Sequence, residues 1–180
     1  MEPHLQAFAT ELVDGAGGSD TVSYRSASAG ITVDLSLATA QAVGGGQGID
    51  TLVSIENLTG SAFDDVLGGS GGNNAIDGGA GFDTLSFAGA AGGVTVSLAL
   101  SGGQAVGGGQ GTDTYAGIEA LVGSAFDDSL TGDGGDNRLT GGVGNDTLTG
   151  GGGRDTAVYS DASGAVTVNL ATGLASGGGL

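Results

Sequence analysis

The stretch Gly123–Val158 divides without remainder into four nine-residue units: GSAFDDSLT, GDGGDNRLT, GGVGNDTLT and GGGGRDTAV. Every unit begins with Gly, and three of the four carry Leu at the eighth position. The sixth position always holds Asp or Asn, namely Asp128, Asn137, Asp146 and Asp155. We therefore interpret the rest of the chain from this nine-residue period.

Each unit combines a turn with a short strand. The first six residues are rich in Gly, Asp and Asn, which tolerate positive φ and close backbone approach and so favour turns. The last three residues favour a strand whose middle aliphatic side chain points inward. Two units make one flat coil, so Asp146 is expected directly above Asp128, which holds the same position two units earlier.

Stacked turns of this composition suit a hard cation. Neighbouring strands lie about 4.8 Å apart, and calcium takes roughly 6–8 oxygen ligands at about 2.3–2.6 Å. The spacing of the turns is therefore about twice a calcium–oxygen distance, so that one ion between two stacked turns could bind oxygens of both. Carboxylates and turn carbonyls supply the oxygens, and glycine keeps side chains out of the way. The spacing thus predicts calcium (Ca2+) as the bound ion.

The composition restricts the classes of function. The 180 residues include 42 Gly, no Cys and 20 acidic residues against three Arg, for a formal net charge of −17. That charge argues against nucleic acid or an anionic membrane surface as a partner. The absence of Cys excludes a disulfide scaffold, and no apolar run reaches transmembrane length. The start of the sequence lacks the basic and apolar regions of an ordinary signal peptide.

Similar nonapeptides recur through most of the chain. Tandem copies cover 51–86 and 114–158, and isolated copies lie at 15–23, 45–53 and 108–116. These units resemble the GGxGxDxUx nonapeptide of RTX-type (hemolysin-type) calcium-binding proteins. The resemblance implies an all-β fold, a right-handed parallel β-roll or β-solenoid. It also implies calcium between turn i and turn i+2, bound by sixth-position aspartates and turn carbonyls.

Carried over to this sequence, the resemblance implies specific ligands. The best pairs are Asp65 with Asp83 and Asp128 with Asp146, followed by Asn137 with Asp155. Further candidates are sixth-position aspartates whose stacking partners the sequence leaves open, and glycine carbonyls of the turns. The aspartates are Asp20, Asp50 and Asp113, and the glycines are Gly79, Gly81, Gly142 and Gly144.

Some units depart from the pattern. Phe63 and Phe126 occupy the fourth position, where Gly is expected, and could narrow those sites. Glu56 over Asn74, and likewise Glu119 over Asn137, are poorer pairs that could instead form a solvated edge with side-chain hydrogen bonds, and we favour this interpretation for Glu56 and Asn74. Four other turn acids are expected in solvent: Asp64, Asp127, Asp133 and Asp136.

The units are arranged in larger copies. Residues 1–14 form a non-repetitive lead, where Leu5, Phe8, Ala9 and Leu12 fit one helical face; it is either a cap on the open end of the stack or extraneous to the fold. From 15 to 180 we expect one β-roll array with a 63-residue internal period and a truncated third copy. The wider, strand-rich inserts at 24–43 and 88–107 form either broad coils or hairpins. Two alternative divisions of the sequence into nonapeptides overlap at 51–53, and only one of them can apply to these residues.

These features favour a calcium-binding module of a secreted protein. We expect the calcium-free chain to be disordered, and calcium to fold it outside the cell. The family implies export by a type I route and possible fusion to a larger secreted protein. The alternatives are the C-terminal appendage of a secreted hydrolase (a metalloprotease, lipase or polysaccharide-modifying enzyme) and an adhesin or carbohydrate-binding module. The lone His4 and the absence of Cys and Lys leave no catalytic constellation, so the chain itself is not expected to be an enzyme.

Overall fold

The computed structural model describes residues 10–160, 162, 166–169 and 174–177. Within these residues the chain is all-β, and no helix long and apolar enough to cross a membrane occurs among them. The first nine strands are β1 (Thr10–Asp14), β2 (Thr21–Ser23), β3 (Thr32–Asp34), β4 (Gln41–Ala42), β5 (Ile49–Val53), β6 (Asn57–Thr59), β7 (Val66–Gly68), β8 (Ala75–Asp77) and β9 (Thr84–Ser86). The others are β10 (Thr95–Ser97), β11 (Gln104–Ala105), β12 (Thr112–Ala116), β13 (Ala120–Val122), β14 (Ser129–Thr131), β15 (Arg138–Thr140), β16 (Thr147–Thr149), β17 (Thr156–Val158), β18 (Val166–Asn169) and β19 (Leu174–Gly177).

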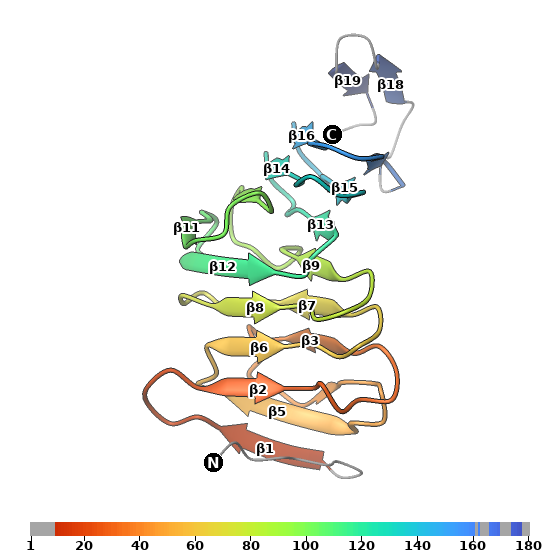
Figure 1. The fold of residues 1–180 in the computed structure, drawn as a ribbon. Helices are drawn as coiled ribbons and strands as arrows, with labels where there is room; N and C mark the ends of the chain where they lie inside the picture. The colour runs from red at the N-terminus through yellow and green to blue at the C-terminus, as the bar shows by residue number, and fades with distance from the viewer. Residues whose placement is uncertain (1–9, 161, 163–165, 170–173, 178–180) are drawn as a thin grey trace.

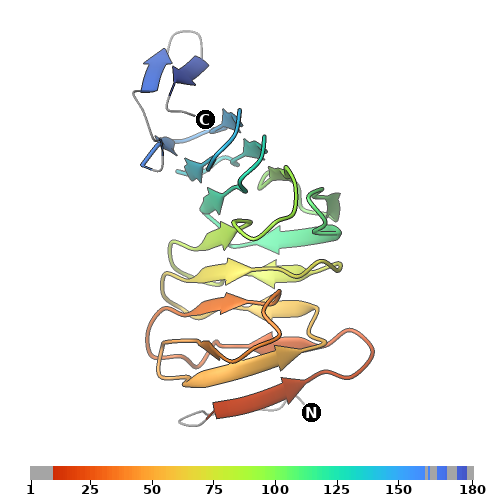
Figure 2. The same cartoon turned by 180° about the vertical axis from the view of Figure 1, so that it is seen from behind.

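The strands stack into a parallel β-roll. One sheet has the strand order β11-β12-β8-β6-β2, and a second has the order β17-β15-β13-β9-β7-β3. Figure 1 shows β2, β6, β8 and β12 as successive rungs, and Figure 2 shows the roll from behind. Leu58 pairs with Ile76 and Leu67 with Leu85, so in both cases the partners are two nonapeptides apart. The predicted coil of two nonapeptides is therefore confirmed.

Inward side chains from the facing sheets fill the roll as one hydrophobic core. The middle residue of most three-residue strands is buried, because side chains alternate between the two faces of a strand. Leu67, Leu85, Leu121 and Leu130 are fully buried. Tyr24 and Phe87, which occupy equivalent positions after a nonapeptide, are also buried in this core.

The long internal copies alternate between the two sheets. Strands β2, β6 and β8 lie in the five-stranded sheet, whereas their counterparts in the next copy, β9, β13 and β15, lie in the six-stranded sheet. One nonapeptide is half a coil, and the period of a copy is an odd number of nonapeptides. A new copy therefore begins on the opposite side of the roll.

Each insert combines the two expected forms: its first strand widens a coil of the stack, and its second strand forms a hairpin with the strand that follows. Their first strands, β3 and β10, pair in parallel with β7 and β14 and so belong to the stack. Their second strands, β4 and β11, pair antiparallel with β5 and β12. Apolar residues alternate from Ile31 to Leu37 in the first insert, but its strand is confined to Thr32–Asp34 and Leu37 is exposed to solvent.

The overlap of frames at 51–53 resolves in favour of a long strand. Residues 51–53 complete the five-residue strand β5, and a turn of only three residues, 54–56, leads into β6. Ser54 takes a φ of 53°, which permits this tight reversal. The same short turn recurs at 117–119, between β12 and β13, where Gly117 has a φ of 57°.

The prediction of a helical lead is wrong for its described part. Leu12 lies in β1, which pairs in parallel with β5 and forms the last strand of its sheet. In sequence, LVDGAGGSD from Leu12 to Asp20 aligns with AIDGGAGFD from Ala75 to Asp83. The lead thus ends in a diverged repeat strand, and the remainder of the proposed helical face, with His4, lies outside the described residues.

Candidate calcium sites

The turns of neighbouring coils stack closely on one another. A Cβ added to Gly79 would collide with the carbonyl oxygen of Ser61, and one added to Gly81 would lie 2.6 Å from the carbonyl carbon of Phe63. Gly142 and Gly144 face Ser124 and Phe126 in the same way. All four glycines have positive φ. Carbonyl oxygens of one turn therefore face the glycines of the next, with no side chain between them.

Hydrogen bonds join the sixth-position residues of successive coils. The N–H of Asp65 donates to Oδ1 of Asp83 at 2.8 Å, and the N–H of Asp128 donates to Oδ1 of Asp146 at 3.0 Å. The N–H of Asn137 donates to Oδ1 of Asp155, also at 3.0 Å. The structure thus brings together all three pairs expected from the sequence; their binding of a metal remains a prediction.

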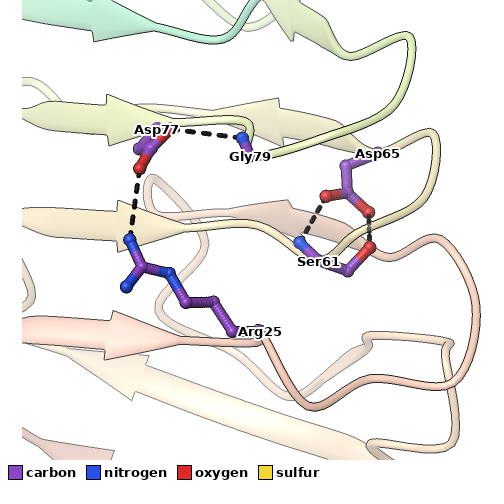
Figure 3. A network of polar contacts seen from close by, with 5 residues as sticks. All are labelled: Arg25, Ser61, Asp65, Asp77 and Gly79. Carbon is purple, nitrogen blue, oxygen red and sulfur yellow. Dashed lines mark hydrogen bonds and ion pairs between the residues drawn. The ribbon is translucent and has the colours of Figure 1, made fainter.

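The carboxylates of Asp65 and Asp128 are occupied by protein donors. Oδ2 of Asp65 accepts the N–H of Ser61 at 2.6 Å, and its Oδ1 accepts the Ser61 hydroxyl at 2.7 Å (Figure 3). Oδ1 also accepts the N–H of Ile31 at 2.9 Å. Asp128 has the same three partners one copy later, from Ser124 and Val94. The serine at the second position of GSAFDD therefore closes these turns, a role that the nonapeptide pattern does not predict.

Other sixth-position carboxylates have a free oxygen. Asp83 is fully buried, yet its Oδ2 has no hydrogen-bond partner. Oδ2 of Asp20 and Oδ1 of Asp50 are likewise buried and unpartnered. A buried carboxylate oxygen without a donor is costly, and a cation would satisfy it. Such carboxylate oxygens fit a hard cation such as calcium.

The electrostatics of Asp83 agree with this. Burial, helped by the neighbouring acids Asp65, Glu119 and Asp64, raises the pKa of Asp83 to about 6, against the lowering effect of the hydrogen bond from the Asp65 N–H. Burial also raises the pKa of Asp50 and of Asp113. Burial therefore disfavours the charged form of these carboxylates, and none of them forms an ion pair with a basic side chain among the described residues.

The structure supplies neighbours for the aspartates whose partners the sequence left open. Asp113 stacks on Asn74, whose N–H donates to Asp113 Oδ1 at 2.8 Å. Asp50 pairs in register with Glu11 across β1 and β5. The N–H of Asp20 donates to Oε2 of Glu56 at 2.9 Å. All three candidate ligands thus lie between coils.

Two tyrosines hold two of these carboxylates in place. The hydroxyl of Tyr24 donates to Oδ2 of Asp50 at 3.1 Å, and that of Tyr115 donates to Oδ2 of Asp113 at 2.7 Å. Burial, together with the adjacent carboxylate, raises the pKa of both tyrosines. These side chains orient the acids inside the roll.

The two phenylalanines do not fill the turns. Phe63 and Phe126 are 45% and 46% exposed, so their rings point away from the roll. Their backbone carbonyl groups still face Gly81 and Gly144. The expected narrowing of the turns by a side chain at the fourth position is therefore not observed.

Backbone oxygens must contribute to any metal site. Within the described part of the chain, no group of three or more His, Cys, Asp or Glu side chains is arranged to hold a metal ion. Calcium readily accepts backbone carbonyls as ligands, and the turn carbonyls of Ser61, Phe63, Ser124 and Phe126 face the inter-turn space. A site here would combine one or two carboxylates with several carbonyls.

Comparison with known proteins agrees with the geometry. The family described as RTX calcium-binding nonapeptide repeat (4 copies) matches residues 54–85 and 122–157. A search of curated proteins finds no match. The matched segments contain the stacked turns at Asp65, Asp83, Asp128, Asp146 and Asp155. The repeats of this family bind Ca2+, and the chain carries such RTX calcium-binding nonapeptide repeats in both matched segments of its parallel β-roll.

Proposed function

We propose that this chain is a calcium-dependent folding module, which stays unfolded at low calcium and folds into the β-roll when calcium binds between its turns. The observation that carries the proposal is the buried, unpartnered oxygen of Asp83 in a stack of glycine turns. A fully buried carboxylate in this position destabilises the roll until a cation neutralises it.

The charge balance supports dependence on calcium. The chain has a formal net charge of −17, and among the described residues one ion pair is formed, between exposed Arg25 and Asp77 at 3.4 Å (Figure 3). Each bound calcium ion would remove two units of negative charge. Because ordered turns exist only in the folded chain, the free energy of metal binding contributes directly to folding.

The setting we propose is extracellular. Weak calcium sites of extracellular modules work at about 10⁻⁴–10⁻³ M calcium, so a roll of this kind would remain unfolded during export and fold afterwards. We further propose a type I route, a larger secreted protein to which residues 15–180 belong as one array, and a supporting rather than catalytic role. The RTX repeats support this proposal, since such repeats typically occur in secreted proteins.

Far-ultraviolet circular dichroism tests the proposal. The spectrum should change from coil to β-rich as calcium rises, and a chelator should reverse the change. Magnesium is the control, because it requires octahedral geometry at about 2.0–2.1 Å and dehydrates reluctantly; it should fold the chain poorly. A β-rich spectrum without calcium, or no change up to tens of millimolar calcium, would reject calcium-dependent folding.

A further inference from the structure

The described glutamates have one feature in common. There are three of them, Glu11, Glu56 and Glu119, and each lies beside an aspartate that has a buried, unpartnered oxygen. Glu119 and Glu56 accept hydrogen bonds from the N–H groups of Asp83 and Asp20. Glu11 is the register partner of Asp50. Glutamate therefore occurs in the described chain where an aspartate oxygen is left free.

Two of these pairs form at the short turns, 54–56 between β5 and β6 and 117–119 between β12 and β13. Turn 117–119 has three residues, whereas a full nonapeptide turn has six. The N–H groups of Glu119 and Ala120 both donate to the carbonyl of Asp83, at 3.1 and 2.9 Å. Glu119 in turn accepts the N–H of Asp83 on Oε2, at 2.9 Å. Glutamate thus takes the place of the sixth-position aspartate in a shortened turn. Its longer side chain reaches the N–H of the aspartate in the neighbouring coil.

The atoms around Gly78 show where the free oxygen of Asp83 lies. A Cβ on Gly78 would lie 2.7 Å from Asp83 Oδ2 and would also collide with the carbonyl oxygen of Gly117. These two oxygens therefore lie on the same side of Gly78, beside the turn that carries Glu119. Oε2 of Glu119 is engaged by the Asp83 N–H, which leaves its second carboxylate oxygen for another ligand.

The first copy repeats the arrangement. A Cβ on Gly15 would collide with the carbonyl oxygen of Ser54 and would lie 2.7 Å from Asp20 Cβ. The N–H groups of Glu56 and Asn57 both donate to the carbonyl of Asp20. Asp20 and Glu56 thus reproduce, one copy earlier in the chain, the contacts of Asp83 and Glu119.

The turns of Asp20 and Asp83 differ from the turn of Asp65 in the donors that reach the aspartate carboxylate. Asp65 has three protein donors on its carboxylate, among them the Ser61 N–H. In the turn of Asp83, the N–H at the second position, that of Gly79, instead donates to Asp77 at 3.2 Å. Ala16 donates to Asp14 in the same way. The donor that would satisfy Asp20 or Asp83 is therefore diverted.

We propose that each short turn holds a calcium ion outside the nonapeptide-to-nonapeptide sites, one between Asp83 and Glu119 and one between Asp20 and Glu56. The ligands would be the two carboxylates of each pair and the carbonyl of Gly117 or Ser54. Calcium suits this set because it accepts carboxylate and carbonyl oxygens together and fills its remaining positions with water. No basic side chain forms an ion pair with either site in the described residues. The inference depends on the proposed calcium-dependent function.

Calorimetric titration with calcium tests the two sites on the full chain. The variants are Glu119→Gln, Glu56→Gln and the double variant, since the amide oxygen of Gln can still accept the aspartate N–H. Asp127→Asn is the charge-matched control, because Asp127 is exposed and serves only as an acceptor for Asn145. Each single variant should lose one calcium equivalent or weaken one site at least tenfold. The double variant should lose two, and the control none.

The outcomes separate this inference from the proposed function. If the wild-type chain takes up no calcium, the proposed function fails. If it binds calcium but Glu119→Gln and Glu56→Gln retain its full stoichiometry and affinities, the short-turn sites are rejected. Circular dichroism at saturating calcium verifies folding. Should a variant not fold, anomalous diffraction from wild-type crystals with calcium decides: a peak between Asp83 and Glu119 supports the site, and its absence overturns it.

Discussion

The N–H of Asp65 donates a hydrogen bond to Oδ1 of Asp83, which lies one coil further along the roll. The same bond joins Asp128 to Asp146. It fixes one carboxylate oxygen of each upper aspartate, so that side chain is oriented by the backbone of the coil below. Any ion between the turns meets a ligand that is already positioned, which reduces the entropy lost on binding.

Glycine at the fourth position of a turn is required by both conformation and space. Gly81 has a φ of 141°, and an added Cβ would lie 2.6 Å from a backbone atom of Phe63. Gly81→Ala should therefore destabilise the calcium-loaded roll by at least about 1–3 kcal/mol. Thermal unfolding at saturating calcium measures this. Gly134→Ala is the matched control, because its Cβ would meet nothing within 4 Å; equal losses in both variants would contradict the stacked turns.

The hydroxyl of Ser61 stabilises its turn without metal. It donates to the buried carboxylate of Asp65 at 2.7 Å, and hydrogen bonds to charged groups are worth about 1.5–3 kcal/mol. Ser61→Ala should lower the free energy of unfolding by that amount and leave the number of calcium ions bound unchanged. The exposed Ser101→Ala serves as control. A loss of bound calcium in Ser61→Ala would show that this turn is a metal site in which Ser61 takes part.

The inward leucines should dominate the stability of the roll. Leu121 is fully buried and pairs in register with Leu85 on one side and Leu139 on the other. Leu121→Ala should cost about 2–5 kcal/mol, as for other buried leucines. Leu100, 52% exposed, gives the control, and Leu100→Ala should change stability by less than about 0.5 kcal/mol. Chemical denaturation at saturating calcium compares them.

Much of the roll follows from local sequence. The nonapeptide fixes turn, strand and inward leucine, so the coil of two units and the stacking of Asp65 under Asp83 are predictable. The diverged strand at Leu12–Asp14 is not predicted by the nonapeptide pattern, because it carries the repeat without a preceding glycine turn. Its match to Ala75–Asp77, at the same period as the other copies, is the signal that could have found it.

The partners of the glutamates could not be predicted from the nonapeptide period alone. The insert at 24–43 lengthens the coil that follows Asp20, so the partner of Glu56 is Asp20, twice as far away along the chain as a regular stacking partner. The carboxylate of Glu56 is directed to Asp20, while its backbone carbonyl accepts the side chain of Asn74 at 3.0 Å. The interpretation of Glu56 and Asn74 as a solvated edge is corrected, because Asn74 is buried and Glu56 reaches the other neighbouring coil, although a side-chain hydrogen bond does join the two residues.

Tyrosine titration tests the buried Tyr–Asp pairs. Tyr24 and Tyr115 have their pKa raised above the usual 10.0 by burial and by Asp50 and Asp113. A raised pKa in the folded state means that the unfolded chain releases these protons first, so stability present below about pH 10 falls as the pH rises above it. Two of the three tyrosines should stay protonated above about pH 10 until the roll unfolds, and then ionise together. Tyrosinate absorbance, read with circular dichroism, measures this; ionisation of both before unfolding would contradict the pairs.

Amide hydrogen exchange at Asp65 and Asp128, measured by NMR with and without calcium, tests most directly whether calcium holds the turns in their stacked arrangement. Both N–H groups donate to aspartates of the next coil, so their exchange reports on that stacking. With saturating calcium both amides should exchange slowly, and removal of calcium should bring them to the rate of an unfolded chain. Equal protection in the presence and absence of calcium would contradict the account.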